Sequence, residues 1–169
     1  KFDGKERGEN SKALPPTAFV NFLQNHDQIG NRAFGDRLAG LSTPEKLRAG
    51  LAILLLSPQV PMLFMGEEWA AEQPFLYFCD FHGELAEAVR KGRREEFKQA
   101  YEKYGDDIPD PVAEKTFRSA KLDWEACAMP PGREHMDLVR ELLAIRRDKL
   151  VPHLADARFG AARFDRDLR

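Results

Sequence analysis

The chain has 169 residues, of which 43% are hydrophobic and 32% are charged, and its 26 basic residues face 28 acidic ones for a net charge of −2. This balance favours neither a nucleic-acid nor a membrane-surface partner, and the longest apolar stretch, at 50–56, is too short to span a bilayer. The start has no charged-then-apolar signal pattern, so we expect a cytoplasmic protein. The two cysteines, Cys79 and Cys127, have no metal-ligand spacing, so we expect them to be buried free thiols.

The first part of the chain predicts a strand, a helix and a second strand. A polar segment that ends in two prolines leads into a predicted strand at 17–23. After a glycine-containing loop at 30–41, a hydroxyl side chain, a proline and a glutamate at 42–45 indicate a helix start, and leucines at helical spacing carry the helix to about residue 57. Residues 60–65 are apolar throughout, which is typical of a parallel strand covered by helices on both faces.

The second half of the chain predicts mostly helices. Residues 84–104 have apolar positions at helical spacing, but Gly92 and a charged cluster at 90–96 interrupt them, so we expect two helical pieces. The charged cluster is typical of a solvated face, with a sugar or protein contact as the alternative. Residues 134–150 predict the clearest late helix, and the chain beyond it, at 151–169, predicts a linker or the start of a separate β domain.

A cluster of polar residues stands where the first strand is expected to end. It consists of Asn25, His26 and Asp27. In parallel α/β architectures, reacting groups gather at the carboxyl ends of strands, because the turns there vary while the strands hold them rigidly. Asp27 is therefore a candidate reactive carboxylate. The alternatives are a structural carboxylate at a strand end or helix cap for Asp27, and a satisfied, partly buried histidine for His26.

The longer string at 24–32, Gln-Asn-His-Asp-Gln-Ile-Gly-Asn-Arg, resembles the fourth sequence region of the α-amylase superfamily, glycoside hydrolase family 13. Within that superfamily, this string and the segments at 61–69 and 74–78 are similar to the malto-oligosyltrehalose trehalohydrolase family. The resemblance implies that 1–150 form the last two strand–helix units of a (β/α)8 barrel, an α/β fold that here is mostly helical by residue count. A complete barrel typically needs about 250 residues, so this chain holds only part of one.

The resemblance also implies a reaction. Members of this family cleave the α-1,4-glucosidic bond next to the terminal trehalose of malto-oligosyltrehalose and release trehalose. For this chain it implies that Asp27 stabilises the oxocarbenium-like transition state, that His26 binds a hydroxyl of the same ring, and that Asn25 helps to position the pair. The nucleophile and the general acid come from upstream strands in the family, so we expect the chain alone to be inactive. No acidic cluster has a spacing suited to calcium, and we expect no cofactor.

Four further residues are expected near the sugar chain. Gln28 and Arg32 are candidates for sugar contacts, although Arg32 would alternatively pair with Asp36 and hold the loop. Glu68 is expected to have a structural or subsite role, and Trp69 to form an exposed platform for a glucose ring. Glu68 and the glutamate before it are a poor catalytic pair, because adjacent residues in an extended chain point to opposite sides.

Two other functions stay open. One is a glucan branching or debranching enzyme of the same superfamily, which product analysis would separate from a trehalose-releasing enzyme. The other is a small carbohydrate-binding or interaction domain without catalysis, which should bury its own strands. Two parallel strands without neighbours leave edges and apolar faces uncovered, so the chain is either a piece of a longer protein or associates with itself through 18–23 and 60–65.

Overall fold

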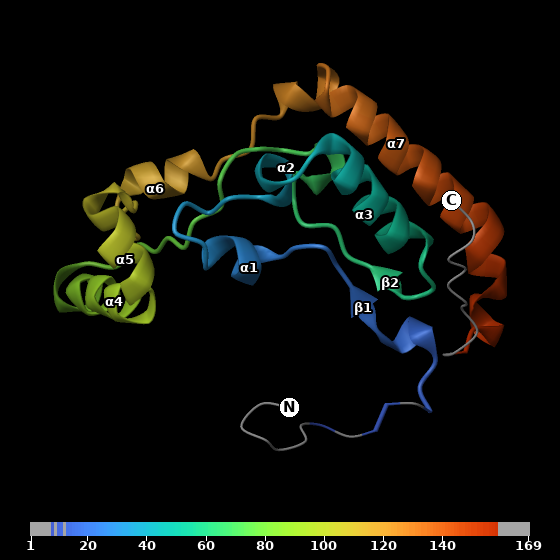
Figure 1. The fold of residues 1–169 in the computed structure, drawn as a ribbon, viewed down its shortest axis with the longest axis horizontal. Helices are drawn as coiled ribbons and strands as arrows, with labels where there is room; N and C mark the ends of the chain where they lie inside the picture. Colours follow the sequence, from blue (N-terminus) through green and yellow to red (C-terminus); the bar gives the residue numbers. More distant parts are fainter. Residues whose placement is uncertain (1–7, 9, 12, 159–169) are drawn as a thin grey trace.

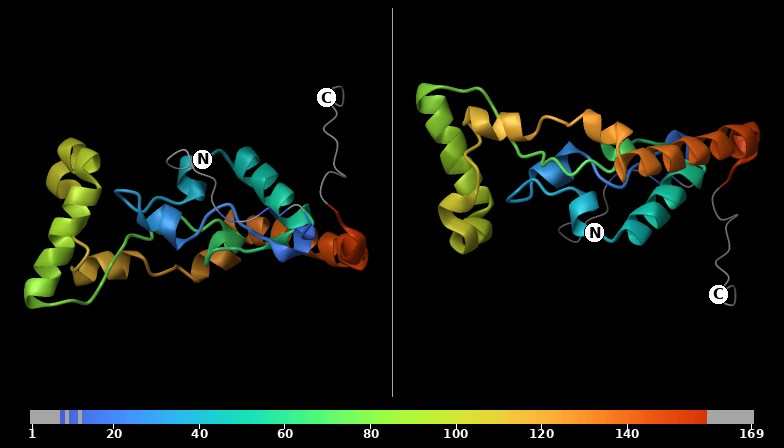
Figure 2. Two further views of the ribbon diagram at one scale, coloured as in Figure 1. Left: turned by 90° about the horizontal axis from the view of Figure 1, so that it is seen from below. Right: turned by 90° about the horizontal axis from the view of Figure 1, so that it is seen from above.

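The computed structural model describes residues 8, 10–11 and 13–158, and Figure 1 shows them as an elongated body. Helices α4 and α5 form an arm at one end, with α6 beside them, while α3 and α7 lie near the other end, and both views of Figure 2 keep the arm and α7 at opposite ends. The α-helices are α1 (His26–Gly30), α2 (Leu38–Leu41), α3 (Pro44–Leu56), α4 (Gly83–Glu96), α5 (Lys98–Tyr104), α6 (Glu114–Ser119) and α7 (Gly132–Ile145). The strands and short helical turns are β1 (Val20–Asn21), β2 (Val60–Pro61), η1 (Pro16–Ala18), η2 (Glu67–Trp69), η3 (Gly105–Asp107), η4 (Glu125–Ala128), η5 (Arg146–Leu150) and η6 (Val151–Asp156).

The two strands lie side by side and run parallel. Val20 stands opposite Val60, and α3 makes the connection between the strands. The predicted strand–helix–strand unit is therefore confirmed. Both strands are shorter than the predicted ranges 17–23 and 60–65, because η1 occupies the start of the first range and because, in the described part of the chain, each strand pairs with the other along a single edge.

Helices α3 and α7 pack against each other to form the main core. Helix α3 begins where the sequence indicates, with the Thr43 hydroxyl accepting a hydrogen bond from the backbone N–H of Lys46 at 3.4 Å and a proline in the first turn. Each leucine buried in such a core contributes about 2 kcal/mol through the loss of water contact. The buried side chains of this core are Leu51 and Leu55 from α3 and Val139 and Leu142 from α7.

An arginine from the end of α7 closes the carboxyl end of α3. The buried guanidinium of Arg146 donates hydrogen bonds to the backbone carbonyls of Leu55 at 3.0 Å, Gln59 at 2.7 Å and Ser57. The last carbonyls of a helix have no partner within the helix, so a fixed cation at this position satisfies them. Burial lowers the pKa of Arg146. The predicted late helix is present, and its last turn, η5, is π-helical.

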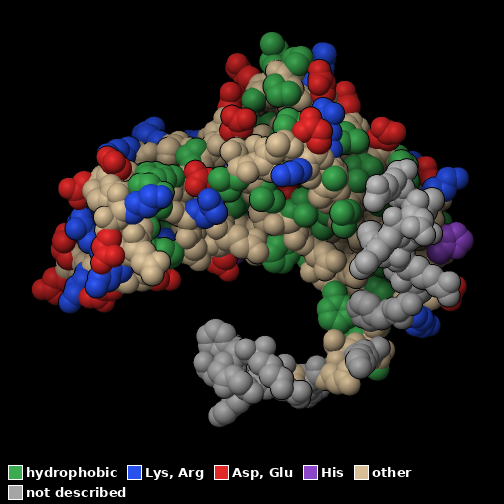
Figure 3. Space-filling view, in the orientation of Figure 1, with side chains coloured by type: hydrophobic (Ala, Val, Ile, Leu, Met, Phe, Trp, Pro, Cys, Tyr) green, Lys and Arg blue, Asp and Glu red, His purple; other side chains and the backbone are tan. Residues whose placement is uncertain are grey.

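Many apolar side chains near the strands face outward. The prediction that 60–65 would be covered on both faces fails within the described residues, because the side chains of Val60 and Met62 are exposed. Figure 3 shows hydrophobic side chains at the surface around α3 as well. This exposure agrees with the argument that two isolated strands leave apolar faces uncovered. The exposed side chains include Val20, Phe22, Ile53, Val60 and Met62.

The arm contains two helices, as the sequence predicts for 84–104. The break between α4 and α5 falls at Phe97 rather than at Gly92, which lies inside α4 with open space where a side chain would stand. The residues that would begin a β element, from 159 onward, lie outside the described part of the chain. In the described residues, no helix combines the length and the hydropathy that crossing a bilayer requires. Both cysteines are free thiols, as predicted, but they are half-buried rather than buried.

Candidate functional site

Helix α1 carries the candidate residues and begins with a capping box. The Asn25 side-chain oxygen accepts hydrogen bonds from the backbone N–H groups of Asp27 at 2.9 Å and Gln28 at 3.2 Å. The Gln28 side-chain oxygen accepts one in return from the Asn25 N–H at 3.0 Å. These bonds satisfy orphan donors of the first turn and fix its position after β1. Asn25 therefore holds the backbone, as a positioning residue would. Gln28 was predicted to contact the sugar chain, but its side-chain oxygen is engaged in the cap.

His26 and Asp27 lie in the first turn of α1 with their side chains in the open. They are 69% and 72% exposed, and the His26 Nε2 lies 3.4 Å from the Asp27 Oδ1. The alternative of a partly buried histidine is therefore wrong. Asp27 does lie at a capped helix start, as the structural alternative expected, yet the cap is made by Asn25 and leaves the carboxylate free. Two exposed polar groups on a fixed turn are suited to bind hydroxyl groups.

Arg32 follows α1 and pairs within its own loop. Its Nε donates to the Asp36 Oδ2 at 3.3 Å, and both side chains are more than one-third exposed. The loop-holding alternative for Arg32 is thus present in the structure. An exposed pair of this kind contributes little to stability, typically less than about 1 kcal/mol.

The turn after β2 is built around a left-handed glycine. Gly66 has φ of 84°, and a Cβ there would stand 2.8 Å from both Ala71 and Leu122. Glu67 and Glu68 then lie in the 3₁₀ turn η2 rather than in extended chain, so our reason for separating them was wrong. Their environments do differ, because Glu67 is 4% exposed whereas Glu68 is half-buried.

Glu67 is the most perturbed acid in the described structure. Burial raises the pKa of Glu67 from 4.5 to about 7, against the opposing effect of the Phe64 N–H, which donates to its Oε2 at 2.8 Å. The nearby carboxylate of Glu68 raises that pKa further, and the guanidinium of Arg37 lowers it. A carboxyl group in this position titrates near neutral pH and holds its loop from the inside.

Arg37 ties the loop that follows α1 to the loop that follows β2. Its buried guanidinium donates to the carbonyl of Met65 at 2.7 Å and to that of Gln73, and it lies 5.0 Å from the centre of the Phe64 ring. Beside it, the buried Gln24 accepts from the Leu38 N–H at 3.0 Å.

The Gln24 side chain also lies close enough to Glu67 to lower the pKa of that carboxyl group. Gln24 directly precedes the capping residue of α1, and Glu67 lies in η2. The contact between Gln24 and Glu67 therefore links the candidate residues after β1 to those after β2, as expected for the carboxyl ends of adjacent parallel strands.

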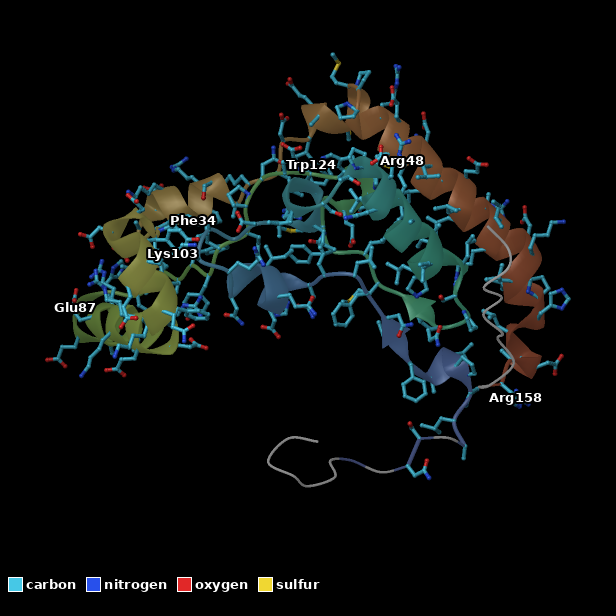
Figure 4. All side chains as sticks on the ribbon, viewed as in Figure 1. Phe34, Arg48, Glu87, Lys103, Trp124 and Arg158 are labelled. Atoms are coloured by element: carbon cyan, nitrogen blue, oxygen red, sulfur yellow. The ribbon has the colours of Figure 1, made fainter. Side chains whose placement is uncertain are left out.

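Trp69 does not form the exposed platform that we predicted. It is 4% exposed, because η2 packs it against the amino end of α7. Among the described residues, the most exposed of the large aromatic side chains is that of Trp124, 68% exposed, whose ring centre lies 5.1 Å from that of Trp69 at an interplanar angle of 45°. Figure 4 labels Trp124 near the amino end of α7, away from the arm. Trp69 is itself a buried residue of η2, so its ring packs inward instead of facing a ligand.

Comparison with known proteins shows what this chain is similar to. No family model matches the chain. The malto-oligosyltrehalose trehalohydrolase of Deinococcus radiodurans is 46% identical over 153 residues, which make up 88% of this chain and 25% of that protein. The chain is homologous to the malto-oligosyltrehalose trehalohydrolases. Those of Mycobacterium tuberculosis H37Rv and Saccharolobus solfataricus are 41% and 37% identical, and each match covers at least 85% of this chain.

A solved structure supports the same relationship. A Salmonella typhimurium protein described as an alpha amylase is 49% identical and superposes with a TM-score of 0.84 over 91% of this chain and 26% of that chain. The chain thus shares the structure of part of an α-amylase and is related to glycoside hydrolases of that family. It spans about a quarter of the length of the trehalohydrolases it matches.

Sequence reasoning missed three buried residues, Gln24, Arg37 and Glu67. Gln24 stood in the quoted string without a role, and Glu67 was considered only as a partner of its neighbour. A charged residue between two loops gives no periodic signal, so Arg37 could not be identified from its position alone. Among the described residues, no group of three or more His, Cys, Asp or Glu side chains is arranged to hold a metal ion.

Proposed function

We propose that this chain supplies the last two strand–helix units, at 1–150, of a (β/α)8 barrel glycoside hydrolase. The whole polypeptide would cleave the α-1,4-glucosidic bond next to the terminal trehalose of malto-oligosyltrehalose. The observation that carries this proposal is the exposed pair His26 and Asp27 on a capped turn after β1, in a chain homologous to trehalohydrolases. Residues 151–169 would connect the barrel to a further β domain.

Asp27 would act on the charge that develops during cleavage. As the bond to the leaving group breaks, the sugar ring flattens and positive charge grows at the anomeric carbon. A carboxylate that hydrogen-bonds the ring hydroxyls strengthens those bonds as the charge grows, so it lowers the barrier more than it improves binding. His26, 3.4 Å from the Asp27 carboxylate, would bind a neighbouring hydroxyl of the same ring.

The other candidate residues would hold or extend this subsite. Asn25 fixes the turn, and Gln28 retains its amide N–H groups as donors while its oxygen serves the cap. Arg32 would reach the sugar chain from its exposed pair with Asp36. Glu68, whose buried Oε2 has no hydrogen-bond partner in the described part of the chain, would accept from a sugar hydroxyl or from the remainder of the barrel.

The experiment is a product analysis of the full-length polypeptide that contains this chain, with malto-oligosyltrehalose as substrate. We expect free trehalose as a product. Replacing Asp27 by Asn should lower kcat by about a hundredfold or more with a smaller change in KM. Asp137→Asn, on the exposed face of α7, is the matched control and should leave both unchanged. New α-1,6 linkages, or loss of such linkages from a branched glucan without trehalose, would instead indicate a branching or debranching enzyme.

A further inference from the structure

The helical arm contacts the segment that carries the candidate site, and an arginine of the arm makes the polar part of this contact. Arg93 of α4 donates hydrogen bonds from Nη2 to the Gly30 carbonyl at 3.0 Å and from Nη1 to the Asn31 side-chain oxygen at 3.1 Å. Gly30 is the last residue of α1, and Asn31 is its carboxyl cap. The arm therefore reaches the end of the same five-residue helix that begins with His26 and Asp27.

Arg93 differs from the rest of the charged cluster in which it lies. The sequence predicted this cluster to be a solvated face, and Lys91 and Arg94 do have exposed side chains. The Arg93 side chain is only 17% exposed, so the prediction is wrong at this position. Its guanidinium carbon lies 4.7 Å from the ring centre of Tyr77 and 4.2 Å from that of Phe97. Contacts with two aromatic rings hold the planar group in one orientation and favour it over a hydrated alternative.

A second contact joins the arm to the same segment. The ring of Phe34 packs edge-on against that of Tyr104, with the centres 5.1 Å apart. Figure 4 labels Phe34 close to Lys103, the residue before Tyr104 at the end of α5. The arm thus touches the chain between α1 and α2 at two points, one polar and one aromatic.

Helix α1 depends on such outside support. A helix of this length is far below the roughly 12 residues that an isolated helix needs to be marginally stable. The capping box secures its first turn, whereas the carbonyl of Gly30 at its end is bonded by Arg93. Without Arg93, the Gly30 carbonyl would lose this donor, and the end of α1 would keep only its backbone hydrogen bonds and the buried side chain of Ile29.

We propose that Arg93 is a positioning residue for the His26 and Asp27 pair, so that the arm formed by α4 and α5 sets the rate at which the site works. This inference rests on the proposed function for its effect on turnover. A carboxylate that must be in place when the charge develops loses rate when its position spreads, because a displacement of about 1 Å costs up to a hundredfold. Sugar binding, which draws on many contacts, should change less.

The test compares four variants of the full-length polypeptide: Arg93→Ala, Arg93→Lys, Asn31→Ala and the control Arg94→Ala. The control removes the same charge from the next position of α4, where the side chain faces solvent and contacts Asp106 and the ring of Tyr101. Two readouts are taken for each: kcat and KM for trehalose release, and the hydrogen exchange rates of the backbone amides at 27–32.

We expect Arg93→Ala to lower kcat about tenfold with KM changed less than about threefold, and to speed amide exchange across α1. Arg93→Lys should recover part of kcat, because an ammonium group can still donate to Gly30 but lacks the planar fork that directs two nitrogen atoms at the two acceptors. Asn31→Ala removes one acceptor without altering the arm, so it should produce a smaller effect in the same direction and keeps the test valid if Arg93→Ala misfolds. Arg94→Ala should match the unaltered enzyme.

The proposal is overturned if Arg93→Ala folds and matches Arg94→Ala in kcat and in exchange across α1, or if Asn31→Ala leaves both readouts unchanged. A fall in kcat that lysine does not partly restore, without faster exchange across α1, would also overturn it. If the unaltered polypeptide releases no trehalose, the proposed function fails. The exchange rates then still decide whether Arg93 holds α1.

Discussion

The buried carboxyl group of Glu67 predicts a specific dependence of stability on pH. Burial raises its pKa in the folded state from 4.5 to about 7. Between these values, the unfolded chain releases a proton that the folded chain keeps. The folded state therefore binds more protons, and the free energy of unfolding must fall as pH rises through this window. The penalty is absent below pH 4.5 and fully present above about pH 7.

The size of the effect follows from the shift. A change of one pKa unit corresponds to about 1.4 kcal/mol, so a shift of about 2.5 units would lower the free energy of unfolding by up to roughly 3 kcal/mol across the window. Glu67→Gln keeps the oxygen that accepts from the Phe64 N–H but cannot ionise. Relative to the unaltered protein, this variant should gain roughly 3 kcal/mol between about pH 4 and pH 8.

Urea unfolding of the full-length polypeptide at several pH values measures this difference. The matched control is Glu72→Gln, because Glu72 is an exposed glutamate a few residues farther along the same loop. The free energy of unfolding of the control should differ from that of the unaltered protein by a similar small amount at every pH. If Glu67→Gln and the unaltered protein keep parallel stability curves from acid to alkaline pH, Glu67 does not stay protonated in the fold and the reasoning fails.

Two further substitutions test how the site loop and the core are held. Gly35 has φ of 64°, and an added Cβ would stand 2.7 Å from the backbone nitrogen of Leu76. Gly35→Ala should therefore lower the free energy of unfolding by about 2 to 3 kcal/mol, measured by thermal unfolding, and should also lower turnover. Gly40→Ala, which meets open space, is its control, and equal effects would contradict the steric argument. Arg146→Met should lower the free energy of unfolding in urea by roughly 3 kcal/mol, because the carbonyls of Leu55, Ser57 and Gln59 lose their donor. An unchanged urea midpoint would show that this cap is dispensable.

The local parts of this structure were predictable because their causes lie close together in the sequence. Thr43 and the proline after it start α3 where the pattern indicates. Asn25 and Gln28 stand at the spacing of a capping box and form one at the start of α1, a helix that we did not predict although its signal is equally local. Each of these features needs only residues within one or two turns of one another. Hydrophobic spacing likewise located α3 and α7, because the leucines that face each other share one side of each helix.

Several of the errors concern residues whose environment is set from far along the chain. Trp69 was expected outside, but the amino end of α7, some 60 residues later, covers it. Arg93 was expected in solvent, but it meets the end of α1 at a separation of 63 residues. The strands were expected to be longer, yet their length depends on neighbours that this chain does not contain in its described part. None of these partners leaves a periodic signal near the residue it affects.

The candidate site combines both kinds of support, and this explains why its candidate residues were easier to identify than the residues that hold them. Asp27 was identified from its place after the first predicted strand and from the string at 24–32, which are local in the sequence, and Asn25 and Gln28 specify its turn. Its position relative to the rest of the molecule depends on distant contacts, with Arg93 at the end of α1 and the buried pair of Gln24 and Glu67 beneath its start. A locally capped turn of five residues is too short to fix a carboxylate by itself, so the precision that catalysis requires must come from these distant groups.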